Sequence, residues 1–501
     1  MPFVDATGAD EAMEKAFSKK MVPERKLWLC NAIANVPVAE TYSSPVPIPH
    51  FIDHDVALFG VYSMERSIPS VCDGLKVCQR KVIWVTMFVR SYISKGNEVK
   101  VAQLGAAVSE ISMYLHGEQS LFDTIINLGQ RFCGSNNLPL LFDNGNFGSR
   151  LGKPASGPGS DAASPRYIFT YSTGFANALM DKADLAVLPR LTEEGKPVEP
   201  ETLAPCLPTV LINGCSAIAT AYSTTVPPYN PREVLANVRS FLKDGPDVQF
   251  APMAPFYAGF KGAITADGDG KWRVTGVYTR KGDDFTITEV PVSVGFAKLA
   301  GIYSSDDMQL VDNRSTGSSA HFVVRFRTPE ALQAAEKKGI EKALHLVDSV
   351  STKNMHLFKP DGTIHLYANT SEILSDFCVW RLGIYVKRKA HLVHELTNQA
   401  EVLRNRHRFV SEIIAGSIVV QTGDEAALRA TLANKAYLSM PEGGYDYLCD
   451  IKLVTITMDR AAKLAAQLRA TEEELEMLRK RSPQDLWSAD LDAVELTMAA
   501  R

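Results

Sequence analysis

Two segments near the C-terminal end repeat apolar residues at heptad-compatible spacing, and this pattern constrains the fold more than any other feature. It predicts one long helix from 371 to about 415 and a second helix from about 459 to 480. Between them lies a polar stretch, 416–457, with the turn sequence PEGG. This order fits an antiparallel two-helix arm with a small globule at its tip, although two ordinary bundle helices would give the same pattern. The apolar positions are Cys378, Leu382, Tyr385, Leu392, Leu396, Leu403, Val410 and Ile413 in the first helix, and Leu464, Leu468, Leu475 and Leu478 in the second.

The N-terminal part of the chain reads as helices joined by irregular segments. Residues 1–55 begin as a polar helix and continue into a connector between Pro37 and Pro49, where the prolines block continuous helix. Residues 56–145 carry apolar residues at 3–4 spacing, which is typical of short helices in a helix-turn-helix or winged-helix module. The Gly-, Ser- and Pro-rich stretch 145–164 predicts a mobile loop, and the following RYIFTYS predicts a short strand.

The middle of the chain, 205–370, has a mixed pattern. Alternating runs separated by DGDG and KGDD predict a β-meander, and PEALQAAEKKGIEKAL predicts a helix after it. The expected fold class is therefore α/β multidomain (α+β).

Composition excludes several classes of protein. Hydrophobic residues make up 46% and charged residues 22% of the 501, so the chain is not globally disordered. The net charge of −4 excludes a uniformly basic coat for nucleic acid. No apolar run reaches the roughly 18 residues of a membrane span, and no secretory signal opens the chain, so we expect an intracellular protein without membrane contact. The eight scattered cysteines form no CxxC pair, and HExxH, GxxxxGK[ST] and GxSxG are absent from the sequence. The sequence therefore predicts no metal ligands.

A weak basic surplus lies in residues 60–170. This segment has eleven Lys and Arg against eight Asp and Glu, a net of +3, which a solvated helix face explains as well as DNA binding does. Taken alone, His116 is most simply a hydrogen-bonded surface or capping residue, and Tyr167 a core or surface residue of a strand.

Several segments together resemble, in colinear order, the type IIA DNA topoisomerases, and the eukaryotic enzyme more closely than the bacterial gyrase A subunit. The most specific segment is DAASPRYIFT, which resembles the active-site tyrosine motif of that family. The other segments are KAFSKK (15–20), ERKLWL (24–29), RSIPSVCDGLKVCQRKV (66–82), YLHGEQSL (114–121), 134–152, LINGCSAIATAYS (211–223) and KRSPQDLWSADL (480–491).

The resemblance implies a set of roles. Tyr167 would attack a DNA phosphodiester, Arg166 would stabilise charge on the phosphorane, and His116 would hydrogen-bond a phosphate oxygen or the reacting hydroxyl. Other positions would hold the DNA backbone or orient the site, and an apolar residue would wedge between bases to bend the duplex. The first group is Arg66, Asp73, Lys76, Arg80 and the neighbouring Lys81, and the wedge is Ile218.

The chain departs from the family pattern in places. Leu115 stands where the family has the first histidine of a pair, and Ala219 and Ala221 stand at glycine positions beside Ile218. The family's acidic metal-binding motifs and its ATPase module do not occur in these 501 residues. Mg²⁺ and ATP would therefore be bound by a partner polypeptide or by other domains of the same enzyme.

The resemblance also implies a domain order and a function. We expect an N-terminal helix with its linker in 1–55, a winged-helix domain with the active-site tyrosine in 56–200, a tower domain in 201–370, and a coiled-coil arm with the exit-gate dimerisation domain in 371–501. The expected function is transient breakage of double-stranded DNA by a homodimer, for ATP-dependent strand passage in relaxation and decatenation. The alternatives are a catalytically silent DNA-binding scaffold and a coiled-coil interaction protein with no DNA role. Salt-dependent binding of duplex DNA would separate the last from the other two.

Overall fold

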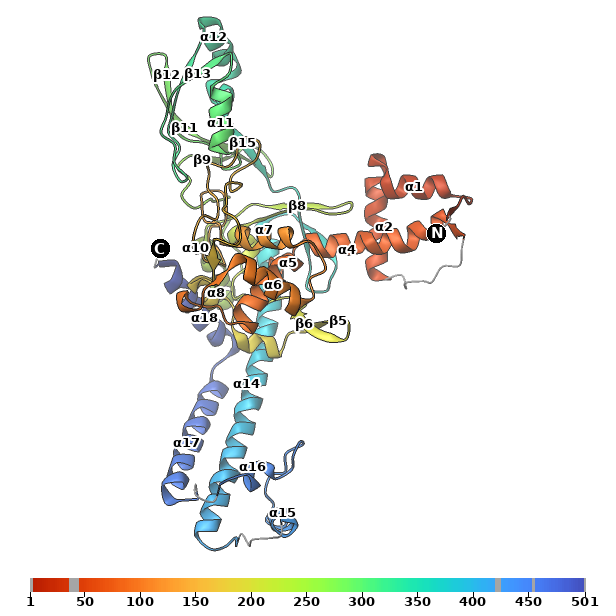
Figure 1. Ribbon diagram of the computed structural model, residues 1–501, viewed down its shortest axis with the longest axis vertical. Coiled ribbons are helices and arrows are strands. Elements are labelled where there is room, and N and C mark those ends of the chain that lie inside the picture. The colour runs from red at the N-terminus through yellow and green to blue at the C-terminus, as the bar shows by residue number, and fades with distance from the viewer. Residues whose placement is uncertain (1–2, 36–44, 420–424, 453–455, 500–501) are drawn as a thin grey trace. The chain divides into compact units, whose positions relative to one another are not determined.

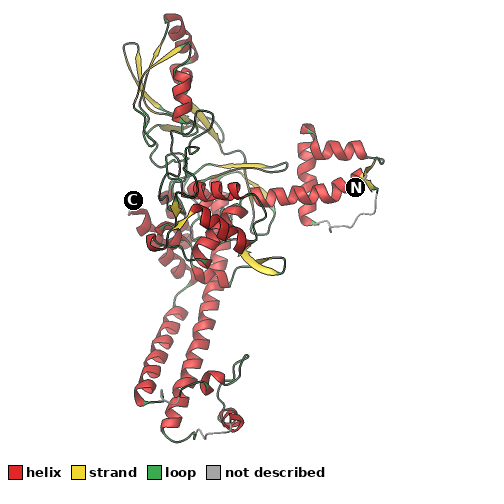
Figure 2. Ribbon diagram, in the orientation of Figure 1, coloured by secondary structure: helices red, strands yellow, loops and turns green. Residues whose placement is uncertain are grey.

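The computed structural model describes residues 3–35, 45–419, 425–452 and 456–499 (Figure 1). The chain divides into two compact units. The first comprises Met1–Arg381 with Ser488–Arg501, and the second comprises Leu382–Trp487. Both units mix helices with irregular segments, and the named strands lie in the first (Figure 2). The mixed α and β composition agrees with the expected fold class. The finer boundaries at 55, 200 and 370 stay predictions.

Short helices form the N-terminal part of the first unit. Ala12 and Ala16 of α1 pack against Ile52, and Ala32 of α2 packs against Ala57 and Val61 of α4. The expected Pro-rich connector falls largely on 36–44, which lies outside the described residues; its end, Val46–Pro47, pairs in parallel with the first strand. The elements are β1 (Phe3–Val4), α1 (Ala9–Phe17), η1 (Lys19–Met21), α2 (Val22–Ala34), β2 (Val46–Pro47), α3 (Ile48–Phe51), η2 (Ile52–Val56) and α4 (Ala57–Ser67).

A helical layer follows and carries the candidate site. Val101, Leu104 and Val108 of the predicted amphipathic stripe are fully buried, which confirms that part of the pattern. The helix ends at Ser112, because Met113 adopts a left-handed conformation, and Leu115 therefore lies beyond it and is 76% exposed. The elements are α5 (Val77–Trp84), η3 (Val85–Val89), η4 (Lys95–Asn97), β3 (Val99–Lys100), α6 (Val101–Ser112), α7 (Glu118–Gly129), β4 (Phe169–Thr170), α8 (Gly174–Leu179), η5 (Lys182–Ala186), β5 (Arg190–Glu193) and β6 (Lys196–Pro200).

The middle segment forms two hairpins that belong to different sheets, which corrects the predicted continuous meander. The first hairpin joins β9 (Ala263–Ala266) to β10 (Lys271–Thr275), and its sheet extends to β15 (Val347–Ser351). The second joins β11 (Val277–Lys281) to β12 (Asp284–Glu289), and its sheet extends through β14 (Phe322–Phe326) to β13 (Met308–Asn313). The break falls at Gly276, where a Cβ would lie 2.3 Å from the carbonyl oxygen of Glu289. The predicted turn at 267–270 does close a hairpin.

The larger of these sheets has a dense apolar core. Phe285, Ile287, Phe322 and Tyr303 are among its buried residues, and α11 and α12 lie beside the strands (Figure 1). The elements are α9 (Thr209–Asn213), β7 (Cys215–Ile218), β8 (Ser223–Val226), α10 (Pro231–Asp244), β9 (Ala263–Ala266), β10 (Lys271–Thr275), β11 (Val277–Lys281), β12 (Asp284–Glu289), α11 (Phe296–Tyr303), β13 (Met308–Asn313), β14 (Phe322–Phe326), α12 (Pro329–Lys338), α13 (Ile340–Ala343), β15 (Val347–Ser351), β16 (Met355–Phe358) and β17 (Ile364–Tyr367).

The second unit is an antiparallel helix pair with a small globule, as the heptad pattern predicts. The pair consists of α17 (Met458–Lys480) and the part of α14 (Thr370–Ile414) from Leu382 onward, and both helices match the expected ranges closely. Val410 of α14 packs with Leu464 of α17, and Arg404, earlier in α14, bonds Glu472, later in α17. The two helices therefore run in opposite directions. The globule has its own core around Leu432 and contains α15 (Glu425–Asn434) and α16 (Asp446–Cys449); the last helix of the chain is α18 (Pro483–Ala499).

Among the described residues, no helix is both long and apolar enough to cross a membrane. All eight cysteines lie in the described residues, and none of them forms a disulfide bond.

Candidate active site

Tyr167 stands on a tight turn with its side chain in solvent. The residue is 67% exposed, and its backbone N–H donates to the carbonyl oxygen of Ser164 at 2.9 Å. The Arg166 guanidinium lies 5.0 Å from the centre of the Tyr167 ring. The predicted strand is shorter than RYIFTYS, because regular pairing begins only at Phe169. Tyr167 therefore precedes the strand, in a position that leaves its hydroxyl accessible.

The start of α6 holds this turn in place. The first N–H groups of a helix have no partner within the helix. Here Val101 N–H donates to the carbonyl of Ile168 at 3.0 Å, and Ala102 N–H donates to the carbonyl of Pro165 at 3.1 Å. Both neighbours of the Arg166–Tyr167 pair are thus bonded to a rigid element, and Ile168 is buried beneath it. The reactive side chain is exposed while its backbone is fixed.

Several residues of the Gly-rich segment before the turn, where the sequence predicts a mobile loop, are joined by hydrogen bonds. Ser149 donates from both its N–H and its Oγ to the Asp161 carboxylate, at 2.8 and 2.6 Å. Gly159 N–H donates to the Ser149 carbonyl at 2.7 Å, and Ala163 N–H donates to the Asn146 carbonyl at 2.9 Å. These bonds close the segment into a compact loop that leads directly to Tyr167.

His116 lies in the connection between α6 and α7, next to α4. Its Nε2 is hydrogen-bonded to the Tyr62 hydroxyl, and the centre of its ring lies 5.3 Å from that of the Tyr114 ring. Desolvation and then the positive charge of Arg66 lower the pKa of His116 below the ordinary 6.5. The imidazole is therefore neutral at pH 7. Within the described part of the chain, no hydrogen bond joins His116 to Arg166 or Tyr167.

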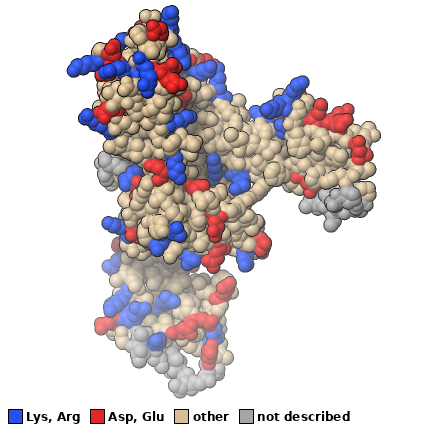
Figure 3. Space-filling model, turned by 45° about the horizontal axis from the view of Figure 1, so that its top comes forward, with Lys and Arg blue, Asp and Glu red and all other residues tan. Residues whose placement is uncertain are grey.

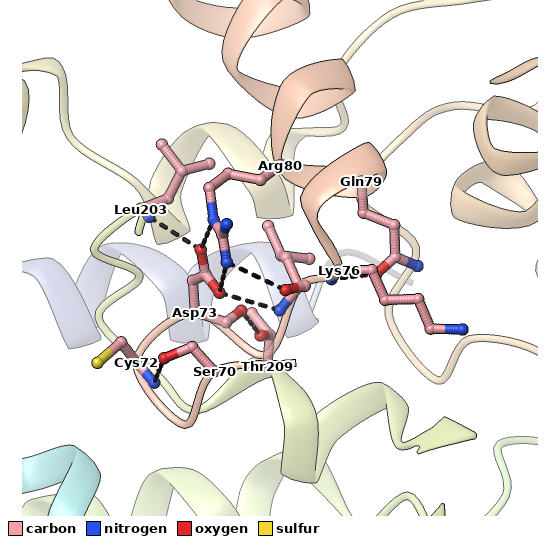
Figure 4. A network of polar contacts seen from close by, with 9 residues as sticks. Ser70, Cys72, Asp73, Lys76, Gln79, Arg80, Leu203 and Thr209 are labelled. Atoms are coloured by element: carbon pink, nitrogen blue, oxygen red, sulfur yellow. Dashed lines mark hydrogen bonds and ion pairs between the residues drawn. The ribbon is translucent and has the colours of Figure 1, made fainter. Parts of the chain in front are cut away.

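Asp73 and Arg80 form a buried ion pair (Figure 4). Arg80 Nη2 donates to Asp73 Oδ1 at 3.1 Å, and Asp73 also accepts from the N–H groups of Leu75 and Leu203. Asp73 has no exposed surface and Arg80 is 6% exposed, so the two side chains bind each other inside the fold. This arrangement suits the expected role of orienting the site, and the expected contact with the DNA backbone stays a prediction. They fix the turn that begins α5 and hold it against the segment around Leu203.

The two lysines of this segment differ. The Lys81 side chain is only 11% exposed, and its Nζ bonds Glu199 at 2.7 Å and the Ser112 carbonyl. Its expected role in DNA contact stays a prediction. Lys76 is half-buried, and its side chain extends away from the Asp73–Arg80 pair toward the Ser216 carbonyl at 2.9 Å (Figure 4). Lys76 and the half-buried Arg66 thus retain exposed surface in this group. On the face drawn in Figure 3, basic and acidic side chains are interspersed.

Ile218 is the last residue of β7, next to the turn of a short hairpin, and projects into solvent. It is 85% exposed and pairs with Ser223 across β7–β8. The turn of the hairpin is anchored by Tyr222, which is buried, contacts Leu29 and Met64 in one apolar cluster, and bonds Cys30 Sγ through its hydroxyl. Among the described residues, Ile218 is the most exposed of the large apolar side chains.

The described residues contain no group of three His, Cys, Asp or Glu side chains that could hold a metal ion. The described residues of this chain therefore do not by themselves form a Mg²⁺ site.

Two residues of the site escape prediction from sequence. Tyr62 reaches His116 from a helix 54 positions earlier, and Arg150 is bound to Glu289, 139 positions later. Nothing local in the sequence signals either contact. The position of Arg150, in the motif region before the tyrosine, is the one hint that the sequence offers.

Comparisons with known proteins agree over nearly the whole chain. The family model for the A subunit of DNA gyrase/topoisomerase IV matches residues 66–492. DNA topoisomerase 2 of Plasmodium falciparum is 32% identical over 97% of this chain and 37% of its own length, and mouse DNA topoisomerase 2-alpha is 35% identical over 96% of this chain and 34% of its own length. The chain thus spans about a third of these curated relatives.

A solved structure shows the same fold. The crystal structure of the DNA-binding, cleavage and re-ligation domain of Plasmodium falciparum topoisomerase II aligns with a TM-score of 0.87 and 31% identity, and the match covers 99% of this chain and 71% of that chain. Family, relatives and structure agree, and the chain belongs to the DNA gyrase/topoisomerase IV family of type II DNA topoisomerases.

Proposed function

We propose that this chain is the breakage-reunion part of a type II DNA topoisomerase and that Tyr167 is its nucleophile. The Tyr167 Oη attacks a backbone phosphorus and forms a P–O bond, while the P–O3′ bond breaks and the 3′ oxygen takes up a proton as a hydroxyl. The product is a 5′-phosphotyrosyl link. The observation that carries this proposal is the exposed Tyr167 phenol, on a turn whose backbone is fixed at both sides and beside the Arg166 guanidinium.

Two transesterifications suit reversible breakage. The covalent link retains the energy of the phosphodiester bond, so the 3′ hydroxyl can attack it and reseal the strand. A free phenol has a pKa near ~10, so its attack needs help from nearby charge. Arg166 is exposed and adjacent, and its guanidinium can stabilise the negative charge that develops on the phosphorane oxygens.

His116 would act as a neutral hydrogen-bond partner to a phosphate oxygen or the reacting hydroxyl. Its lowered pKa and its contact with Tyr62 favour that role over a fixed positive charge. Arg66 and Lys76 would hold backbone phosphates, since both keep exposed surface. Ile218 would insert between bases, where an apolar wedge exchanges stacking energy for a bend.

The whole enzyme requires more than this chain. We infer a homodimer, because each copy cuts one strand of a duplex, with the second unit as the dimerising exit gate. The metal-binding and ATPase polypeptide would bind Mg²⁺ and ATP and drive strand passage for relaxation and decatenation. The chain would then work in the nucleus or another DNA-containing compartment.

Tyr167→Phe tests the assignment of the nucleophile. The chain is mixed with end-labelled duplex, Mg²⁺ and the metal-binding/ATPase polypeptide, and protein bound covalently to DNA is counted after denaturation. We expect the adduct to disappear while duplex affinity changes less than about twofold, because only the attacking oxygen is lost.

Tyr171→Phe is the matched control, since it makes the same change in the same segment. Tyr171 is half-buried and stacks on Phe142 at 4.7 Å, a contact that a phenylalanine keeps. Its adduct yield should equal that of the unaltered chain. Adducts that persist in Tyr167→Phe would refute the assignment.

A further inference from the structure

A buried arginine connects the loop before Tyr167 to the four-stranded sheet β11-β12-β14-β13. The Arg150 side chain is 1% exposed, and its Nη1 bonds the Glu289 carboxylate at 2.7 Å at the end of β12. Its Nη2 donates to the Val290 carbonyl at 2.7 Å, and its guanidinium lies 4.8 Å from the centre of the Phe296 ring. A buried ion pair with this many contacts is costly to break from one side, because the remaining charge is left without a partner in a dry site.

The backbone around Arg150 is held by the same part of the fold. Arg150 N–H donates to the Gly317 carbonyl at 3.0 Å, and Phe296 N–H donates to the Arg150 carbonyl at 2.8 Å. Ala297 N–H likewise bonds the Leu151 carbonyl at 2.9 Å. The loop is thus bonded on both sides to segments that flank the four-stranded sheet.

The next residue on the N-terminal side closes the loop that leads to the tyrosine. Ser149 bonds the Asp161 carboxylate twice, and Asp161 stands six positions before Tyr167. The path from the sheet to the turn therefore has four steps. Glu289 binds Arg150, the chain leads from Arg150 to Ser149, Ser149 binds Asp161, and the chain leads from Asp161 to the turn of Tyr167. Each step is a hydrogen bond, an ion pair or a short run of chain within the first unit.

We propose, resting on the function proposed above, that Arg150 is a positioning residue that links the four-stranded sheet to the Tyr167 turn through Glu289. Through these contacts the sheet holds the loop before Tyr167 in place, and with it the turn that carries the nucleophile. The arginine touches neither substrate nor reacting atoms, so its effect is on the rate of cleavage at saturating DNA and not on DNA affinity.

Arg150→Met tests the link, because methionine fills much of the space but cannot bond Glu289. In the full complex, the rate of adduct formation at saturating duplex should fall by about 10²-fold, the effect of a small misplacement of reacting groups, while the duplex Kd stays within about twofold. Amide hydrogen exchange at Gly159 and Ala163, which close the loop, should become faster, a readout that needs no activity.

Arg325→Met is the matched control. It breaks the Arg325–Asp284 pair of the same sheet, in which both side chains are about half to one-third exposed, and it should change neither the adduct rate nor the loop exchange. Arg150→Lys keeps the charge but loses the forked geometry, and it should recover part of the rate. If Arg150→Met does not fold, Glu289→Gln keeps the size and some hydrogen bonding and should show the same fall in rate at unchanged affinity.

The outcomes separate this inference from the proposed function. If the unaltered chain forms no covalent adduct with DNA, the proposed function is refuted. An unaltered chain that forms adducts, together with a folded Arg150→Met or Glu289→Gln that forms them equally fast, overturns only the link. A loss of rate that follows loss of DNA affinity or of folded protein, with unchanged loop exchange, also overturns it and leaves Arg150 a residue of general stability.

Discussion

The hairpin that carries Ile218 holds a residue in a conformation that L-amino acids avoid. Ala221 has φ of +62°, and it stands where the family resemblance expects glycine. The left-handed conformation costs an L-residue roughly 1–2 kcal/mol, which the surrounding contacts must offset. Two contacts do so: Ala219 N–H bonds the Tyr222 carbonyl at 2.8 Å, and Tyr222 is buried. The hairpin is therefore held in place by Tyr222, although Ala221 in its turn adopts an unfavourable conformation.

Ala221→Gly should stabilise the chain. Glycine removes the steric cost of the left-handed conformation. It also makes the unfolded chain more flexible, which costs about 0.5–1 kcal/mol on folding. We therefore expect the free energy of unfolding to rise by about 0.5 kcal/mol. Ala219→Gly, two positions earlier, has no positive φ to relieve and should destabilise by about 0.4–1 kcal/mol. Thermal unfolding of both variants measures the difference, and equal signs for the two would contradict the assigned turn.

Apolar packing stabilises the pair formed by α14 and α17 in the second unit more than ion pairs do. Val410, Ala461 and Leu464 form a small buried cluster near the globule, whereas the Arg404–Glu472 pair nearby is about half exposed. Exposed ion pairs contribute little, so the apolar cluster dominates. The Tyr385 and Trp487 rings stack at 5.3 Å toward the other end of the pair.

Leu464→Ala should destabilise the second unit by about 2–5 kcal/mol, because it removes a buried side chain and leaves a cavity. Leu478→Ala makes the same change at a half-buried position of the same helix and should cost no more than about 1 kcal/mol. Denaturant unfolding followed by circular dichroism gives both values. Similar losses at the two positions would show that the helices are not paired as described.

Prediction from the sequence succeeded where the signal is local. The heptad repeat located α14 and α17 to within a residue or two, because helix periodicity needs no distant partner. The predicted continuous meander is wrong, because β10 pairs with β15 from more than 70 positions away and because the backbone of Gly276 lies close to the carbonyl oxygen of Glu289. The predicted strand at Tyr167 is longer than the observed one, also because of a distant contact: the N-terminus of α6 bonds the turn that carries Tyr167.

The site residues divide in the same way. Exposure of Tyr167 and Ile218 agrees with the roles that the motifs imply, whereas Asp73, Arg80 and Lys81 are paired with other residues inside the fold. A basic side chain in a motif looks the same in sequence whether it meets a phosphate or a carboxylate. The difference depends on long-range packing, which spacing alone does not encode.

At the scale of the whole molecule, the chain spans about a third of the length of its curated relatives, and within the described ranges no group of three His, Cys, Asp or Glu side chains could hold a metal ion. The chain by itself would bind duplex DNA with an affinity that falls as salt rises, since phosphate contacts release counterions.

The identity of the residue joined to DNA tests the central claim most directly. The chain, its metal-binding/ATPase partner, Mg²⁺ and duplex DNA are combined, the adducts are trapped by denaturation and digested, and the peptide that carries a nucleotide is sequenced by mass spectrometry. We predict a nucleotide joined through its 5′ phosphate to Tyr167, a free 3′ hydroxyl on the other end, and no adduct when the partner is omitted. A nucleotide attached to any other residue, or joined through a 3′ phosphate, would contradict the account.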